Sequence, residues 1–162
     1  MMKLSMEKSL NQQVQKEYGS SYLYLSMSAF FESQGFTGLA AWMRRQSREE
    51  LDHALKFFDF INQHNGRVIL DTISAPTSTW DSVTDVFKAS LVHEEMISKS
   101  IDNLINQAID EKDHASHHFL LEFATEQVEE ENTARDIVRK LELVGDNPTG
   151  LLMLDKELGQ RN

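Results

Sequence analysis

The segment REELDHALKFF (residues 48–58) places ionisable side chains where a long helix should be apolar. Steps of three and four residues put a set of side chains on one face of an α-helix. Burial of an unpaired carboxylate is costly, so the charged centre of this largely apolar face requires a compensating partner. The face consists of Leu39, Met43, Gln46, Glu50, His53, Phe57, Phe60 and His64.

The composition limits what the chain can be. Its 162 residues suffice for one domain with a core, and 40% of them are apolar, as in globular proteins. No apolar run is long enough to span a membrane. The net charge of −10 argues against nucleic acid and anionic membranes as partners. The chain has no cysteine, which excludes disulfides and thiolate ligands, and we expect a cytoplasmic location.

Helix-forming residues dominate the sequence, and its two prolines lie outside the periodic segments. The pattern therefore predicts an all-α protein with four long helices and a short fifth one. We expect a first helix at about 5–33, a break at 34–38, and a second helix at about 39–65 with Gly66 as its C-cap. A third helix should start at a capping signal formed by Ser82 and Asp85 and end at a break at 111–113. A fourth should end at Gly145, and a short fifth should cover about 149–158.

The connection between the second and third helices, roughly residues 66–81, is the longest of the chain. A helix of about 27 residues is about 40 Å long, and about fifteen extended residues reach about 50 Å. This connection can therefore cross the whole bundle and let the two helices that it joins run parallel. The expected fold is a four-helix bundle over about residues 5–145 with one long crossover, the ferritin-like arrangement, followed by the short fifth helix.

Polar residues interrupt each of the four apolar faces at about the same depth in the bundle. At 1.5 Å per residue, these positions share a layer about 18 to 22 Å along the bundle axis. Four carboxylates and one imidazole are therefore predicted to converge inside the core. The interruptions are Glu17 in the first helix, Glu50 and His53 in the second, Glu94 in the third, and Gln127 and Glu130 in the fourth.

Like charges at such short range cannot all stay ionised without a nearby cation. A pair of divalent metal ions would supply the positive charge. Carboxylates with one imidazole suit iron or manganese better than they suit a structural zinc site. The step from Glu50 to His53 places two ligands on one helical face, as in di-iron carboxylate bundles. One such step is typical of chance or of a surface pair, so the coincidence of all four interruptions is what favours a metal site.

Segments in every helix resemble the non-haem ferritins of bacteria: EYGSSYLYL (17–25), REELDHALKFF, HEEMISKSI (93–101), FATEQVEEE (123–131) and GLLMLDKEL (150–158). The resemblance extends over essentially the whole chain and implies a single ferritin-like domain over residues 1–162. In that family, 24 subunits form a hollow shell. A ferroxidase centre in each bundle oxidises Fe²⁺ with O₂ or H₂O₂, and ferric mineral accumulates inside.

The resemblance also implies a role for each candidate site residue. Glu17, Glu50 and His53 would hold a first iron, and Glu50 would bridge to a second iron that Glu94 and Glu130 complete. Gln127 matches a residue that forms a hydrogen bond near the second iron, and Tyr24 matches a tyrosine that can donate an electron or a hydrogen bond. Glu49, Glu126 and Glu129, together with Glu130, match residues that would bind a third iron. From the sequence pattern alone, this last group reads as a solvated acidic face.

Departures from related families argue against other cofactors. Leu51 replaces the haem-binding methionine of bacterioferritins, and Glu130 replaces the second histidine of their ligand set, so we expect no haem. Rubrerythrins need cysteine ligands, which are absent. His117 and Leu120 stand where animal ferritins have an acidic pair that lines a channel, which puts that route of iron entry in doubt here.

Two other functions are alternatives. A passive storage shell would lack ligands at the centre, whereas all five are present here. A mini-ferritin that binds DNA and detoxifies peroxide usually has its metal between subunits and lacks a fifth helix. We therefore predict an iron-storage protein with ferroxidase activity. We expect it to form a homo-oligomer, by resemblance a 24-mer, and to bind neither nucleic acid nor membrane.

Overall fold

The computed structural model describes residues 2–161, and α-helices are the only regular secondary structure in that part of the chain. This confirms the prediction of an all-α protein with four long helices and a short fifth one. The helices are α1 (Leu4–Ser33), α2 (Thr37–Gln63), α3 (Val83–Glu111), α4 (His114–Val144) and α5 (Pro148–Gly159). None of the helices between residues 2 and 161 is long and apolar enough to cross a membrane.

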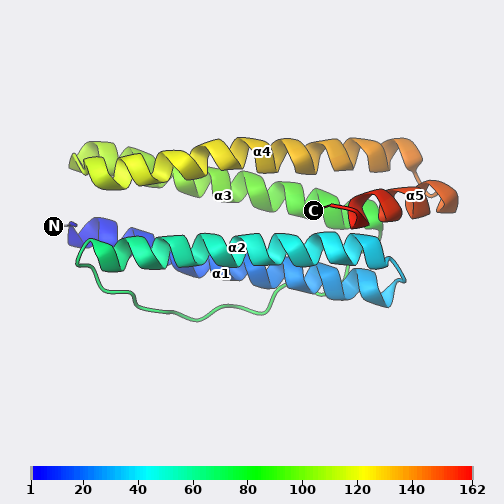
Figure 1. Ribbon diagram of the computed structural model, residues 1–162, viewed down its shortest axis with the longest axis horizontal. Helices are drawn as coiled ribbons and strands as arrows, with labels where there is room; N and C mark the ends of the chain where they lie inside the picture. The colour runs from blue at the N-terminus through cyan, green and yellow to red at the C-terminus, as the bar shows by residue number, and fades with distance from the viewer. Residues whose placement is uncertain (1, 162) are drawn as a thin grey trace.

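The four long helices form a bundle in which α1 packs mainly against α2, and α3 against α4 (Figure 1). Helices α2 and α3 run in the same direction, because the segment between them returns along the length of the bundle, as predicted. Side chains of α1 hold this crossover in place. Asn11 Oδ1 accepts a hydrogen bond from the Ile69 amide at 2.7 Å. Ser26 Oγ donates one to the Thr77 carbonyl at 2.6 Å.

Helices α3 and α4 each begin with a side-chain N-cap. Ser82 Oγ accepts a hydrogen bond from the Asp85 amide at 3.1 Å and donates one to the Asp85 carboxylate at 2.8 Å. Asp113 Oδ1 likewise accepts one from the Ser116 amide at 3.0 Å. These bonds satisfy amides that have no partner inside the helix. The capping signal predicted at Ser82 is therefore confirmed.

The predicted start of α2 was two residues late, because Gly38 lies inside the helix rather than in the break. Helix α5 packs closely over this point: a Cβ on Gly38 would lie 1.9 Å from the Asp155 carbonyl oxygen. The Asp155 side chain also accepts a hydrogen bond from the Leu39 amide at 2.9 Å. Glycine is needed here for close approach between helices, and not for a turn.

The predicted C-cap of α2 was also wrong. The helix ends at Gln63, and Asn65 rather than Gly66 adopts the left-handed conformation, with φ of 59°. Asparagine tolerates this region better than most residues. The Gly66 amide then donates to the Ile61 carbonyl at 2.9 Å, and a Cβ on Gly66 would lie 2.8 Å from the Ile61 side chain.

Two apolar clusters fill the bundle, and a polar layer separates them along each long helix. One cluster includes Met27, Phe31, Met43, Phe87 and Leu141, and the other includes Leu10, Val14, Phe57, Ile101 and Phe123. The buried residues whose positions fall between the two clusters include Glu17, Glu50, His53, Glu94 and Gln127. The prediction that the polar interruptions share one level of the bundle is thus confirmed.

Candidate metal centre

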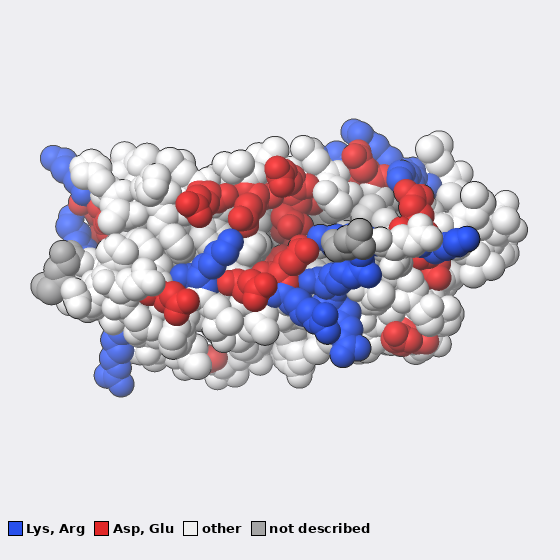
Figure 2. Space-filling view, in the orientation of Figure 1, with Lys and Arg blue, Asp and Glu red and all other residues white. Residues whose placement is uncertain are grey.

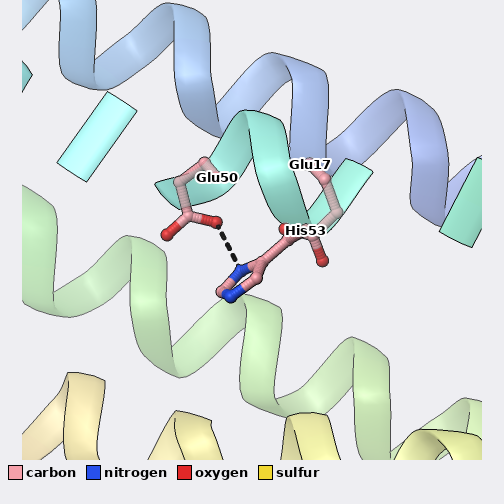
Figure 3. A group of neighbouring side chains, drawn as sticks. All are labelled: Glu17, Glu50 and His53. Carbon is pink, nitrogen blue, oxygen red and sulfur yellow. Dashed lines mark hydrogen bonds and ion pairs between the residues drawn. The ribbon is translucent and has the colours of Figure 1, made fainter. Parts of the chain in front are cut away.

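Glu17 of α1 and Glu50 and His53 of α2 extend toward one another in the middle of the bundle (Figure 3). Each offers one ligand atom, and these atoms lie within 4.8 Å of one another. The three residues are buried, with 1%, 1% and 8% of their surfaces exposed. Among residues 2–161, no other group of three acidic or histidine residues is this close. Carboxylate and imidazole donors at this spacing fit a divalent metal ion.

The Glu17 carboxylate is oriented by a donor on its own helix. Gln13 Nε2 donates to Glu17 Oε1 at 2.7 Å, and Gln13 Oε1 accepts from Ser100 of α3 at 2.7 Å. Glu17 Oε2 is buried and has no hydrogen-bond partner within the described chain. An unpaired buried acceptor is destabilising, and a metal ion between Glu17 and its neighbours would satisfy it.

His53 has a carboxylate next to each ring nitrogen. Its Nδ1 lies 3.3 Å from Glu50 Oε2, and its Nε2 lies 2.9 Å from Glu126 Oε2. A histidine that binds a metal usually donates its second N–H to a carboxylate, which fixes the ring and its tautomer. Glu126 is in the position to do this for His53, with Nδ1 left to face the centre.

Glu94 of α3 and Glu130 of α4 lie beside this group, but hydrogen-bond donors hold them. The Tyr24 hydroxyl donates to Glu94, and Gln127 Nε2 donates to the same carboxylate at 3.0 Å. Gln46 Nε2 donates to Glu130 Oε2 at 2.7 Å. The structure thus places Glu94 and Glu130 in the same layer without bringing their ligand atoms into the compact group.

Burial and mutual repulsion raise the pKa values of these carboxyl groups. The pKa of Glu17 is well above its ordinary value because of burial and then the Glu50 charge. Burial, followed by the Glu94 charge, likewise raises the pKa of Glu50. The same two causes raise the pKa of Glu130 to about 7. Without a cation, these groups therefore retain protons at pH values where exposed glutamates are ionised, and a bound cation would displace those protons.

Acidic side chains gather along the middle of the face formed by α2 and α4, with Lys and Arg side chains beside them (Figure 2). The predicted third-site residues belong to these helices but do not form a compact group. Arg161 Nη2 contacts both oxygens of Glu49, at 2.9 and 3.0 Å. Glu126 contacts His53 and, at 3.4 Å, Lys56. Glu129 is exposed.

The sequence matches known proteins over most or nearly all of its length. The family model described as ferritin-like domain matches residues 7–144. A bacterial non-heme ferritin of Bacteroides fragilis is 42% identical over 161 residues, which cover 99% of this chain and 100% of the relative. One from Escherichia coli is 34% identical over 158 residues, which cover 98% and 96%. The chain belongs to the ferritin family.

Solved ferritin structures agree with this assignment. The open-pore ferritin from the hyperthermophilic archaeon Archaeoglobus fulgidus superimposes with a TM-score of 0.99 and 45% sequence identity, and the match covers 100% of both chains. The resemblance to non-haem ferritins that the sequence suggested is therefore confirmed. Iron storage is the role of this family.

Three polar residues of this ferritin contact the candidate ligands although the sequence pattern indicated no role for them: Gln13, Gln46 and Arg161. Gln13 lies four residues before Glu17, and Gln46 lies four residues before Glu50, a spacing that brings side chains together on a helix. The four-residue spacing could therefore have indicated Gln13 and Gln46 from the sequence alone. Arg161 contacts residues more than 100 positions away, and no local pattern indicates it.

Proposed function

We propose that this ferritin is a ferroxidase that oxidises Fe²⁺ to Fe³⁺ at two adjacent positions in the centre of each bundle. Glu17, Glu50 and His53 hold the first iron. Glu50 bridges to the second, which Glu94 and Glu130 complete. The observation that carries the proposal is the buried group of Glu17, Glu50 and His53, with its unpaired Glu17 oxygen. Membership of an iron-storage family supports iron as the substrate.

The electron acceptor in this proposal is O₂ or H₂O₂. Each Fe²⁺ gives up one electron, so two irons together reduce O₂ to H₂O₂, or H₂O₂ to water, with uptake of two protons. The carboxylates favour the product because their negative charge stabilises Fe³⁺ more than Fe²⁺. Burial excludes bulk water from the site, which strengthens this charge interaction.

Tyr24 and Gln127 act on the second iron position through Glu94. Both donate hydrogen bonds to its carboxylate, and Tyr24 is fully buried beside it, with 1% of its surface exposed. The tyrosine is therefore close enough to supply a hydrogen bond or an electron during oxidation. Burial, and then the Glu94 charge, raise the pKa of Tyr24 well above its ordinary value, so the hydroxyl keeps its proton.

A third iron binds on the acidic face of α2 and α4 in this proposal, with Glu49, Glu126 and Glu129 as ligands together with Glu130. Glu130 is a ligand of both the second iron and the third iron in this proposal, which supports transfer of iron between the two positions. The contact between Glu126 and His53 links the two sites further. Haem has no part in this proposal, and a cytoplasmic location stays a prediction from the sequence.

The stored mineral requires an enclosure, and we propose a shell of 24 copies. Large apolar side chains remain exposed on α1 and the crossover, which supports an interface there. They include Tyr22, Leu25, Ile69 and Leu70, with 46 to 66% of their surfaces exposed. Structures of the Archaeoglobus fulgidus relative are described as an open-pore ferritin and an engineered closed form. Chains of 18.6 kDa would give a particle of about 450 kDa.

Substitution at the centre tests the proposed ferroxidase. Stopped-flow mixing of Fe²⁺ with the assembled protein in air should show a rapid oxidation phase that Glu50→Gln and His53→Ala abolish. Glu32→Gln is the matched control, because Glu32 is an exposed glutamate on α1 and should leave the rapid phase unchanged. Circular dichroism and particle mass report whether each variant folds and assembles. A wild-type protein as slow as the two centre variants would instead indicate a passive storage shell.

A further inference from the structure

Arg161, two residues after the end of α5, lies against the acidic face of α2. Its Nη2 contacts both carboxylate oxygens of Glu49, at 2.9 and 3.0 Å. Its Nη1 donates to Gln46 Oε1 at 3.0 Å, and its guanidinium lies 4.9 Å from the centre of the Trp42 ring. Arg161 therefore has two anchors, Gln46 and Trp42, that do not depend on Glu49.

The Lys56 side chain is a second positive group on the same face, and its contacts are longer than those of Arg161. Lys56 Nζ lies 3.4 Å from Glu126 and 5.6 Å from the centre of the Phe123 ring. The side chains of this pair are 48% and 40% exposed, against 28% and 42% for Arg161 and Glu49. Two of the carboxylates assigned to the third iron are thus already paired with positive side chains, and the pair formed by Arg161 is the tighter one.

We propose that Arg161 is a built-in competitor for the third iron position: it neutralises Glu49 when no metal is bound, and an arriving cation must displace it. This inference rests on the proposed function, since it takes Glu49 as a ligand. A divalent ion bound to Glu49 would lie beside the guanidinium, and like charges at that range repel. Arg161 thereby weakens metal binding at this position.

The contacts of Arg161 with Gln46 and Trp42 explain how it can compete with a metal ion for Glu49. Because Gln46 and Trp42 keep the guanidinium close while Glu49 turns to a metal ion, Arg161 can recapture Glu49 when the ion leaves. Gln46 also donates to Glu130, at 2.7 Å, on its other side. In this proposal, iron therefore binds weakly at this position and leaves it readily.

Calorimetric titration of the metal-free, assembled protein with Zn²⁺ tests the competition without iron oxidation. The variant Arg161→Gln should lower the dissociation constant of the weakest class of specific sites by about two- to fivefold, the range expected for a partly exposed ion pair. In a Glu49→Gln background, the same change should have a smaller effect, because the contested carboxylate is gone and only repulsion between the guanidinium and the ion remains. Lys56→Gln should produce a smaller change, since its ion pair is longer and more exposed.

Arg139→Gln is the control for overall charge. Arg139 also lies on the surface, 3.4 Å from Asp136 in a largely exposed pair, and its loss removes the same charge. The inference is overturned if Arg161→Gln leaves the weak class unchanged or weakens it, if Arg139→Gln matches its effect, or if the effect is undiminished without Glu49. The absence of the weak class in both wild type and Arg161→Gln also overturns it.

The proposed function is judged on different data from the same titration. The tight class of Zn²⁺ sites should require Glu50 and His53 and should not respond to Arg161→Gln. Loss of the tight class in His53→Ala alongside an unresponsive weak class would refute only the role of Arg161. A tight class that survives both centre substitutions would refute the proposed iron pair, whatever the weak class does.

Discussion

Gln13 and Glu17, one helical turn apart on α1, are joined by a hydrogen bond that orients the Glu17 carboxylate. Gln13 Nε2 donates to Oε1 at 2.7 Å, and the buried Oε2 has no hydrogen-bond partner within the described chain. The Gln13 side chain is itself held by Ser100 of α3. The direction of this proposed ligand of the first iron therefore depends on contacts between two helices, as is typical of residues that support metal ligands.

Gln13→Ala should weaken metal binding at the first position. Without its donor, Glu17 can rotate away from the centre, and we expect a loss of about tenfold in affinity for Zn²⁺ or anaerobic Fe²⁺, as for other residues that orient ligands. Calorimetric titration measures it. Gln12→Ala is the matched control, because Gln12 is exposed one position earlier on the same helix. Equal affinities in the two variants would contradict the role given to Gln13.

Tyr24→Phe should slow iron oxidation without removing a metal ligand. The substitution deletes the hydroxyl that donates to Glu94 and contacts Ser90 Oγ at 3.0 Å. We expect two Fe²⁺ still to bind per centre and the rapid phase to slow by about tenfold. Stopped-flow absorbance measures the rate, and Tyr22→Phe, on an exposed tyrosine, serves as the control. A rate equal to that of wild type would show that the hydroxyl has no part in the reaction.

The raised pKa of Glu130 makes the stability of the metal-free protein depend on pH. This pKa rises from 4.5 to about 7 on folding, so the folded state holds the proton more tightly than the unfolded chain. Below pH 4.5 the group is protonated in both states. As the pH rises toward 7, the folded state loses stability on the order of 2 kcal/mol relative to the unfolded state.

Glu130→Gln removes this titration. In chelator-treated protein, urea unfolding should show that the variant gains on wild type between pH 5 and pH 7.5, because glutamine has no proton to release. Saturating Zn²⁺ should reverse the order at pH 7.5, since only the wild type keeps the full ligand set. A difference between the two proteins that stays constant with pH would contradict the raised pKa.

Gly38→Ala should displace α5. Its Cβ would lie 1.9 Å from the backbone oxygen of Asp155, a clash that no side-chain rotation relieves. We expect a loss of more than about 2 kcal/mol in the free energy of unfolding. Gly19→Ala in α1 is the control: the nearest neighbouring atom would lie 4.0 Å away, and alanine should stabilise the helix by about 0.5–1 kcal/mol. Thermal unfolding of both variants tests the contrast.

Periodicity was sufficient to predict the helices and the shared polar layer, because both depend on spacing within a single helix. Glu50 and His53 could be identified as buried from their place between Met43 and Phe57 alone. The length of the crossover was likewise enough to predict that α2 and α3 run parallel. These features follow from the local geometry of the chain.

The start of α2 was predicted wrongly because a distant segment decides the local structure there. Gly38 resembles a helix breaker until Asp155 of α5 is seen to pack against it and to cap Leu39. The contact between Arg161 and Glu49 joins residues 112 positions apart, so no window along the sequence contains both. The candidate ligands could be named from pattern and resemblance, whereas the residues that orient them depended on tertiary contacts.

The crossover has a consequence for the order in which the centre is built. Glu17, Glu50 and His53 all precede it in the chain, whereas Glu94 and Glu130 follow it. During synthesis, a nascent chain that has produced only α1 and α2 would carry one of the two proposed metal positions without the other. Under the proposed chemistry, coupled oxidation of two irons starts only after α4 has emerged from the ribosome and docked, so an unfinished chain is chemically incomplete.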